Sequence, residues 1–183
     1  MSPDDVTAPA VIAVIDTNVL LDFKKVVPVD QQWDLLMAMN KRVGAGSLSF
    51  PRQVANELTT VKHPDAPGAW IASAKHSVQH PEPTETTLVR VLQVAADLIE
   101  ADNPNEVADP YVLAMALELT ERHPTSLVVL VTNDVVDRMP VKISLRTGCQ
   151  RLGVATCQAP ALLRWLTEEN AELVDAEPDR EEQ

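Results

Sequence analysis

Hydrophobic runs alternate with segments of helical periodicity along most of the chain. Residues 11–15 and 127–131 are continuous five-residue apolar runs, a pattern typical of strands buried on both faces. Residues 47–50 and 154–157 are shorter strand candidates. Between these segments, apolar spacing and start signals such as proline at a first helical position predict helices. The predicted helices span residues 17–25, 30–43, 52–60, 69–77, 84–102, 109–122, 141–152 and 160–169.

Buried strands that alternate with helices predict a parallel sheet with helices on both faces. The expected fold class is a three-layer α/β/α protein with a central parallel sheet of four or five strands. We expect one domain over residues 11–170, preceded by a flexible leader at 1–10 and followed by a disordered acidic tail at 171–183. In such sheets, ligands bind beyond the carboxyl ends of the strands, so residues directly after strands are functional candidates.

Each of the two strongest predicted strands is followed by an aspartate, Asp16 or Asp134. If those strands are neighbours, they lie about 4.8 Å apart and both carboxylates reach one point at the sheet edge. Like charges that close repel, and a hard divalent cation such as Mg²⁺ or Mn²⁺ relieves the repulsion by binding their oxygens. Asp109, at the start of a buried helix, and Glu57, on the helix after Pro51, are the candidates that complete such a site.

Each of these acids also has a purely structural interpretation. Asp16 and Asp134 are suited to helix caps or turns, and Asp109 before Pro110 has the sequence of a helix N-cap. Glu57 is compatible with a solvated helix position. The residue types alone therefore leave structural and catalytic roles open.

Four short motifs resemble those of the PIN-domain ribonucleases, a family that includes the VapC-type toxins. The motifs are IDTNVLLDF, VANEL, DPYVLAMALEL and VLVTND, and the resemblance spans about residues 11–165. In that family a first strand ends in Asp followed by Thr or Ser and Asn, and an early helix carries Glu. An Ala-rich helix then begins with Asp, and a later strand runs into Thr-x-Asp. The matching positions here are four acids, Asp16, Glu57, Asp109 and Asp134, and three polar supporting residues, Thr17, Asn18 and Thr132.

The resemblance implies a PIN-like fold and an endoribonuclease that hydrolyses phosphodiester bonds of single-stranded RNA. The four acids are then both the catalytic residues and the ligands of one or two Mg²⁺ or Mn²⁺ ions, which lower the pKa of bound water and stabilise charge on the phosphate. Thr17, Asn18 and Thr132 orient carboxylates or phosphate. The family also implies a toxin of a toxin–antitoxin pair, a small antitoxin partner and a homodimer. A non-catalytic PIN-like scaffold that binds RNA or protein is an alternative.

The net charge of −12 changes how an RNA substrate can be held. Residues 168–183 contribute −7 of it, which leaves −5 for the remainder of the chain. A polyanionic substrate therefore requires bound metal ions together with local basic side chains. Arg138, Lys142 and Arg146, spaced by four residues, are the predicted RNA contacts, with Lys142 and Arg146 on one helix face; a solvated surface stripe is the alternative. Asp137 and Glu106 are candidate additional acids.

Other features narrow the function classes. No apolar run reaches about 18 residues, so we expect no membrane span, and the N-terminal sequence lacks a basic-then-apolar signal pattern. Two cysteines, Cys149 and Cys157, cannot form a disulfide framework, which favours a cytoplasmic location. A haloacid-dehalogenase-like phosphatase is the alternative enzyme, since its nucleophile also ends a first strand. That chemistry needs a second Asp two residues later, where this chain has Asn18.

Overall fold

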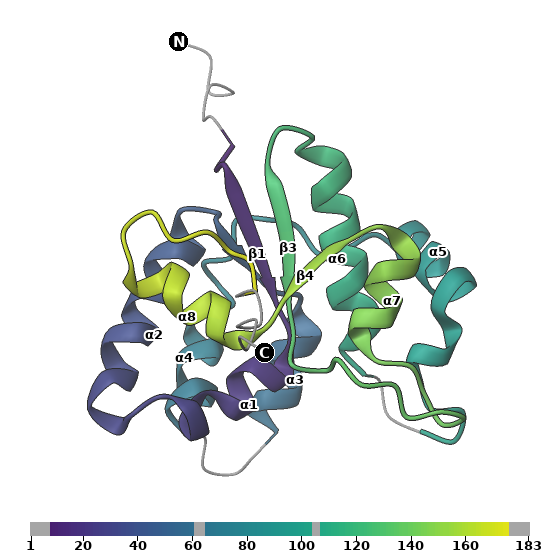
Figure 1. The fold of residues 1–183 in the computed structure, drawn as a ribbon, viewed down its shortest axis with the longest axis horizontal. Coiled ribbons are helices and arrows are strands. Elements are labelled where there is room, and N and C mark those ends of the chain that lie inside the picture. The colour runs from purple at the N-terminus through teal and green to yellow at the C-terminus, as the bar shows by residue number, and fades with distance from the viewer. Residues whose placement is uncertain (1–7, 61–64, 104–106, 176–183) are drawn as a thin grey trace, which may run out of the picture.

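The computed structural model describes residues 8–60, 65–103 and 107–175. Within these ranges, four parallel strands form one sheet in the order β2-β1-β3-β4. The strands are β1 (Val11–Ile15), β2 (Leu48–Ser49), β3 (Leu127–Val131) and β4 (Ala155–Cys157). The predicted α/β fold class with a central parallel sheet is therefore confirmed (Figure 1).

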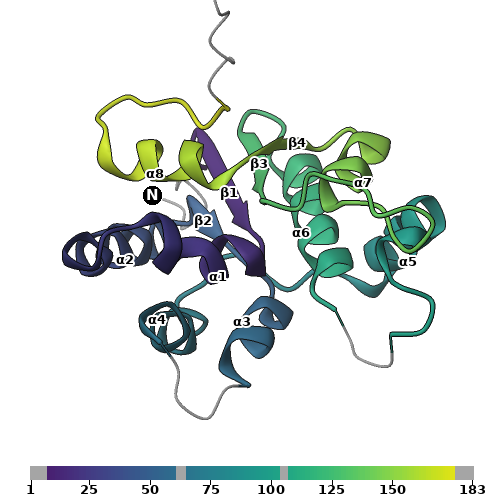
Figure 2. The ribbon, with the colours of Figure 1, turned by 60° about the horizontal axis from the view of Figure 1, so that its bottom comes forward.

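Helices cover both faces of this sheet. They are α1 (Thr17–Val26), α2 (Val29–Gly44), α3 (Arg52–Thr59), α4 (Ala66–Ala74), α5 (Glu85–Ala95), the 3-10 helix η1 (Ala96–Leu98), α6 (Asp109–Arg122), α7 (Leu145–Leu152) and α8 (Ala159–Thr167). Helices α1, α2, α4 and α8 gather on one side of β1 and β3, and α5, α6 and α7 gather on the other (Figures 1 and 2). No helix in the described ranges has the length and apolarity needed to cross a membrane.

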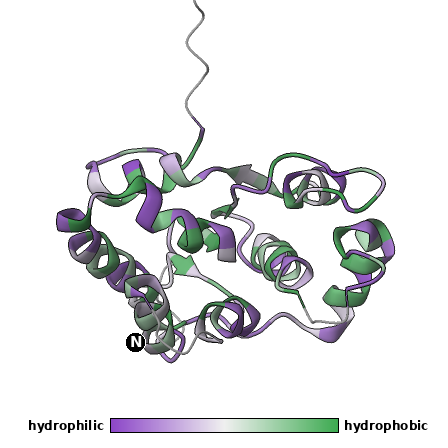
Figure 3. Ribbon diagram, turned by 90° about the horizontal axis from the view of Figure 1, so that it is seen from below, coloured by the Kyte–Doolittle hydropathy of each residue, from purple (hydrophilic) through white to green (hydrophobic). Residues whose placement is uncertain are grey.

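Strands β1 and β3 form the centre of the core because helices cover both of their faces. Residues 12–15 and 128–131 are at most 4% exposed. Helix α6 packs on both strands and buries apolar residues around most of its circumference. Seen from the edge where the strands end, the helices carry both hydrophobic and hydrophilic residues, as expected for helices with one buried face (Figure 3).

Two predicted helices are shorter than their sequence patterns indicated. In place of one helix over 84–102, the chain forms α5 followed by the single turn of η1. The helix stops there because other segments donate hydrogen bonds to its last carbonyl groups. The Arg151 guanidinium donates to the carbonyl of Val94, and the backbone N–H of Ile143 donates to the carbonyl of Asp97. Tertiary contacts thus replace the hydrogen bonds that would have continued the helix.

The helix predicted over 141–152 begins only at Leu145. Ser144 is its N-cap, since the Ser144 Oγ accepts a hydrogen bond from the backbone N–H of Thr147 at 3.2 Å. Lys142 therefore lies in a turn before α7, and the prediction that Lys142 and Arg146 share a helix face is wrong.

The first residues of the segment predicted as a disordered acidic tail, which starts at residue 171, pack against the domain. Leu173 is 1% exposed and packs in the core, and the Asp175 carboxylate contacts Arg146 at 2.9 Å. Asp175 also accepts a hydrogen bond from the backbone N–H of Gln158 at 2.7 Å. At the other end of the predicted domain, the carbonyl of Ala10 accepts from the backbone N–H of Leu127 at 2.8 Å. Ordered packing therefore extends beyond both predicted domain boundaries.

Candidate active site

Asp16 lies where β1 ends and α1 begins, directly beside the end of β3. The two strands are neighbours in the register Ile15↔Val131, as a shared edge requires. Asp16 is 1% exposed; its Oδ1 accepts a hydrogen bond from the backbone N–H of Thr17 at 2.6 Å, and its Oδ2 accepts one from Thr132 Oγ1 at 2.9 Å. Asp16 therefore caps α1, as its structural interpretation predicts, and its carboxylate also binds the residue at the end of the neighbouring strand.

The Asp16 carboxyl is surrounded by negative charge. Burial raises the pKa of Asp16 most, and the carboxylates of Asp109 and Glu57 raise it further. The hydrogen bonds from Thr132 and Thr17 lower it, but the net result is a pKa of about 8. Because a nearby cation favours the ionised form of a carboxyl, a divalent ion at this point would lower the pKa again.

Thr132 links the ends of the two central strands. Its Oγ1 donates to Asp16 and accepts hydrogen bonds from Asn18 Nδ2 at 3.3 Å and from the backbone N–H of Asp134 at 3.0 Å. Asn18 Oδ1 in turn accepts from the backbone N–H of Asn133 at 2.9 Å. Thr132 and Asn18 thus hold Asp16 and the segment that carries Asp134 in a fixed relation.

Glu57 reaches this network from α3. The Thr17 hydroxyl donates to Glu57 Oε2, and the backbone N–H of Ala108 donates to Glu57 Oε1 at 2.8 Å. Although Glu57 is exposed to solvent, both of its carboxylate oxygens are therefore engaged. The contact with Ala108 fixes the residue directly before Asp109, so α3 and the start of α6 meet at the same edge of the sheet.

Asp109 and Asp134 share one cationic partner, Lys142. The Lys142 Nζ lies 2.8 Å from Asp109 Oδ2 and 3.4 Å from Asp134 Oδ2, and the side chain of Lys142 is only 13% exposed. Burial lowers the pKa of Lys142, but the negative charges and hydrogen bonds of the two aspartates outweigh burial and leave the pKa raised. Asp134 Oδ2 also accepts from the backbone N–H of Leu145 at 3.1 Å, at the start of α7.

The structure thus brings the four predicted acids to one edge of the sheet, together with a lysine that was expected to contact RNA. Asp109 and Glu57 act electrostatically on Asp16, and Lys142 joins Asp109 to Asp134. The lysine faces the acids instead of an open surface, and its spacing in the sequence gave no sign of this.

The other two basic residues that were predicted to contact RNA, Arg138 and Arg146, pair with other acids. Arg138 lies 3.7 Å from Glu100 in an exposed ion pair, and Arg146 lies 2.9 Å from Asp175 in a half-buried one. Because each arginine contacts an acid outside the central cluster, these residues do not form a continuous stripe with Lys142.

Asp137 precedes α7 in the chain, and its carboxylate binds the start of that helix instead of joining the four acids. Its Oδ1 accepts hydrogen bonds from the backbone N–H and Oγ of Ser144 and from Thr147 Oγ1, at 2.8, 2.7 and 2.8 Å. These bonds hold the pKa of Asp137 below its usual value. Asp137 is thus part of the α7 cap, and Glu106, the other candidate acid, lies outside the described residues.

The donor chemistry of the cluster suits Mg²⁺ or Mn²⁺, because all four acids offer carboxylate oxygens. In the part of the chain that the structure describes, however, no three His, Cys, Asp or Glu side chains are grouped closely enough to hold a metal ion. Asp109 and Asp134 turn to Lys142 instead. A bound cation therefore requires these side chains to move, and Asp16 has the most to gain because its hydrogen-bond partners are neutral.

The two cysteines lie apart from this chemistry. Cys149 and Cys157 are buried free thiols. Burial raises the pKa of both, that of Cys157 to about 12, so neither thiol ionises at neutral pH. A thiolate nucleophile is therefore absent from the described residues.

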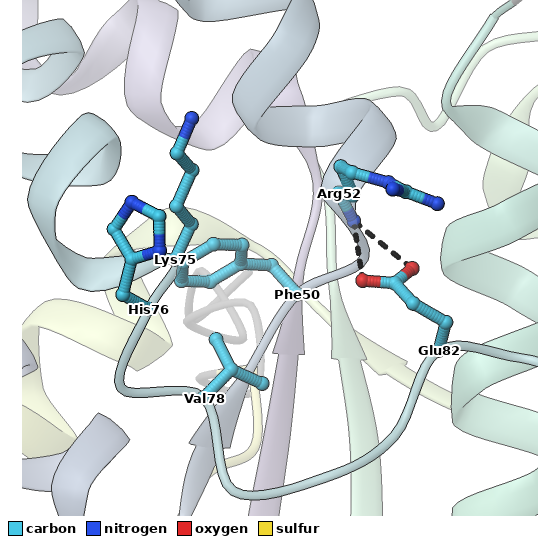
Figure 4. A pocket seen from close by; sticks show the side chains of 6 residues that line it. All are labelled: Phe50, Arg52, Lys75, His76, Val78 and Glu82. Carbon is cyan, nitrogen blue, oxygen red and sulfur yellow. Dashed lines mark hydrogen bonds between the residues drawn. The ribbon is translucent and has the colours of Figure 1, made fainter.

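A cavity of about 220 Å³ opens beside the start of α3, between this helix and the segment after α4 (Figure 4). Both carboxylate oxygens of Glu82 accept from the backbone N–H of Arg52 at 3.1 Å. None of the four acids contributes to it, and its residues were not predicted as functional. They are Phe50, Arg52, Lys75, His76, Val78 and Glu82.

Comparison with known proteins places the chain in a family without an assigned activity. A family model described as "Domain of unknown function (DUF4411)" matches residues 14–171, a range that contains all four acids and Lys142. No curated protein and no solved structure matches the chain.

Proposed function

The chain belongs to the DUF4411 family of unknown function, and from its acidic site we propose that the protein is a Mg²⁺- or Mn²⁺-dependent endoribonuclease acting on single-stranded RNA. The observation that carries the proposal is the place of Asp16, which is 1% exposed at the carboxyl edge of the sheet, lies near the carboxylates of Asp109 and Glu57, and pairs with no cationic side chain among the described residues. An enzyme that uses a divalent cation needs such a site, since the ion neutralises the repulsion between its ligands. The choice of RNA as substrate rests on the resemblance of the sequence motifs to PIN-domain ribonucleases.

Asp16, Glu57, Asp109 and Asp134 are the residues proposed to hold the cation. When bound, the ion lowers the pKa of a water molecule and stabilises charge on the attacked phosphate. Thr132 holds the Asp16 carboxylate toward the site, and Asn18 holds Thr132. Thr17 performs the same task for Glu57. These neutral donors keep the acids in place without reducing the negative charge that attracts the ion.

The alternative activity, that of a haloacid-dehalogenase-like phosphatase, lacks the acidic residue that its chemistry needs. In a haloacid-dehalogenase-like enzyme, the residue two positions after the first aspartate must exchange a proton, and here that residue is Asn18. The Asn18 amide is engaged with Thr132 and with the backbone of Asn133, which is a structural task. We therefore do not propose this activity.

From the same resemblance to PIN-domain ribonucleases we also propose two partners. They are a second copy of the chain and, for a toxin, a small antitoxin. Exposed apolar side chains on α2 support a protein interface, since Val29 is 84% exposed and Trp33 is 68% exposed. Light scattering on wild-type protein and on Trp33→Glu tests the homodimer; a dimeric wild type and a monomeric variant are expected. A monomeric wild type would contradict this part of the proposal.

The direct test of the activity is cleavage of an unstructured, end-labelled RNA. We expect cleavage with Mg²⁺ or Mn²⁺, none with EDTA, and a loss of about 100-fold or more for Asp16→Asn, since even residues that only orient a metal ligand cost 10- to 100-fold. Asp30→Asn is the matched control, because Asp30 is an exposed aspartate on α2. Equal cleavage by Asp16→Asn, or by the wild type in EDTA, would overturn the proposal.

A further inference from the structure

The cavity beside the start of α3 is lined mainly by basic side chains. Arg52 begins α3 on one side of it, and Lys75 and His76 directly follow α4 on the other. Phe50 and Val78 lie between the two sides and form an apolar floor (Figure 4). All three basic residues are exposed to solvent, so a ligand can reach them without a movement of the fold.

No acid pairs with these basic side chains among the described residues. Most other arginines and lysines in the described ranges form an ion pair, whereas the side chains of Arg52, Lys75 and His76 form neither an ion pair nor a hydrogen bond there. Glu82 also lines the cavity, but both of its carboxylate oxygens accept from the backbone N–H of Arg52. The lining thus has a positive net charge, in a chain whose net charge is −12.

The size of the cavity favours one part of a long ligand over a whole small molecule. Its volume of about 220 Å³ is below the roughly 300–1,000 Å³ of pockets that enclose a small ligand. Arginine and lysine on opposite sides of an open cavity suit the phosphate groups of a nucleic-acid strand, which they hold by charge. The basic lining therefore points to an anionic chain that passes through the cavity.

The cavity lies at the same edge of the sheet as the four acids of the acidic cluster. Strand β2 runs parallel to β1 with Ser49 beside Val14, so the residues after β2 reach the edge where Asp16 follows β1. Helix α3 connects the two places, because Arg52 is its first residue and Glu57 lies near its other end. The helical rise places these two positions about 7.5 Å apart along the axis. A strand bound at the acids can therefore continue to the cavity.

We propose that Arg52, Lys75 and His76 bind phosphate groups of the substrate RNA that flank the bond to be cut. This inference rests on the proposed function and identifies where that substrate is held. Contacts of this kind position a strand without specifying its sequence. The residues that the sequence predicted for this role each pair with an acid; they are Arg138, Lys142 and Arg146.

The first test measures binding of an end-labelled, unstructured RNA by fluorescence anisotropy in EDTA, where neither metal ions nor cleavage contribute. Arg52→Gln and Lys75→Gln should each weaken binding about fivefold at about 0.1 M salt, and each should reduce the slope of log affinity against log salt by about 0.7. Lys75→Arg keeps the charge and should bind as the wild type does. Lys41→Gln is the matched control, because Lys41 is also exposed and forms no ion pair with a described residue, but lies on α2 outside the cavity.

Glu82 gives a prediction of the opposite sign. Glu82→Gln removes the negative charge of the lining and keeps an oxygen that can accept from the Arg52 N–H. RNA affinity should therefore rise by about two- to fivefold. A variant that only disturbed the fold would bind RNA less well, so an increase reports the charge of the cavity.

Cleavage kinetics in Mg²⁺ separate this inference from the nuclease proposal. Arg52→Gln and Lys75→Gln should raise KM about fivefold and leave kcat within about twofold, because they remove contacts away from the reacting bond. A dinucleotide, whose single phosphate would occupy the acidic cluster, should be cleaved equally by the wild type and both variants.

The outcomes distinguish failure of one proposal from failure of the other. Metal-dependent cleavage with equal KM and equal RNA affinity in the wild type, Arg52→Gln and Lys75→Gln would overturn the inference and leave the nuclease proposal standing. Equal losses in Lys41→Gln, or no RNA binding by the wild type in EDTA, would also overturn the inference. RNA binding that depends on the cavity residues, without cleavage, would overturn the nuclease proposal alone.

Discussion

Asp16 and Asp134 occupy similar positions in the fold but different electrostatic environments. Both follow a central strand of the sheet, and both lie at its carboxyl edge. Asp16 is 1% exposed and accepts hydrogen bonds from neutral donors, whereas the Asp134 side chain is 20% exposed and lies 3.4 Å from the Lys142 ammonium. The position after a strand therefore brings an acid to this edge of the sheet, but the neighbouring side chains decide whether that acid is paired with a positive charge.

The magnitude of this difference is large for Asp16. A pKa that rises from 3.8 to about 8 corresponds to a preference for the neutral carboxyl of roughly 6 kcal/mol, at 1.36 kcal/mol per unit. Neutral hydrogen bonds, worth about 1 kcal/mol each, cannot remove a preference of this size. A divalent cation can, because it attracts the ionised carboxylate at short range.

The largest expected effect is on the pH dependence of stability in metal-free protein. Because the folded-state pKa of Asp16 is raised, the folded protein keeps a proton that the unfolded chain releases, so the free energy of unfolding falls as pH rises from about 4 to 8. Between pH 4 and pH 7 the loss should be about 4 kcal/mol. Asp16→Asn should lack this loss and become more stable than the wild type at pH 8. Urea denaturation in EDTA at several pH values measures this, and parallel pH profiles for the two proteins would contradict it.

The next largest effect should come from Lys142. Its removal leaves Asp109 and Asp134, with side chains 18% and 20% exposed, without their shared partner. Lys142→Met should therefore lower the free energy of unfolding by about 2–3 kcal/mol, less than the loss of one member of a fully buried pair. Arg138→Met should cost no more than about 0.5 kcal/mol, because its pair with Glu100 is solvent-exposed. Urea midpoints in EDTA compare the two variants, and equal values would show that Lys142 stabilises the fold no more than Arg138 does.

Thr132 tests the hydrogen bonds that connect Asp16 with the segment that carries Asp134. Thr132→Val keeps the shape of the side chain but removes the donor to Asp16 and the acceptor for Asn18 and Asp134. We expect a loss of about 1–3 kcal/mol in stability and of about 10- to 100-fold in RNA cleavage. Thr167→Val is the control, since that exposed hydroxyl contacts only carbonyl groups of its own helix. Unchanged cleavage by Thr132→Val would remove Thr132 from the site.

The smallest effect is expected for Arg146, which pairs with Asp175 outside the acidic cluster. Arg146→Ala should change the free energy of unfolding by about 0.5 kcal/mol, the range of partly exposed ion pairs. Its cleavage rate should stay within about twofold of the wild type, because the side chain contacts none of the four acids. A large fall in RNA affinity, measured by fluorescence anisotropy, would restore Arg146 as a substrate contact.

The sequence predicted the centre of the fold and the acids because both depend on local patterns. The five-residue apolar runs of β1 and β3 are buried on both faces, and an aspartate follows each of them closely. Asp109 follows from its place before a proline at the start of a strongly apolar helix. Glu57 was found through its motif, since an exposed glutamate on a short helix has no local pattern that distinguishes it.

The role of Lys142 could not be predicted because it depends on a turn that long-range contacts fix. The spacing of Lys142 and Arg146 indicated a common helix, but Ser144 is the N-cap of α7, so Lys142 lies before the helix begins. The hydrogen bond from Ile143 to Asp97 joins two segments that are distant in the sequence. Ser144 was the one local signal, since serine is favoured at the start of a helix.

The proposed function depends most on the binding of a divalent cation by the buried Asp16 carboxylate. The most direct measurement is an NMR titration of the Asp16 side-chain carboxyl carbon, with and without Mg²⁺, with Asp16→Asn used to assign the signal. Without metal the carboxyl should titrate with a pKa of about 8, and saturating Mg²⁺ should lower that pKa by at least two units. A pKa that Mg²⁺ leaves unchanged would contradict the account.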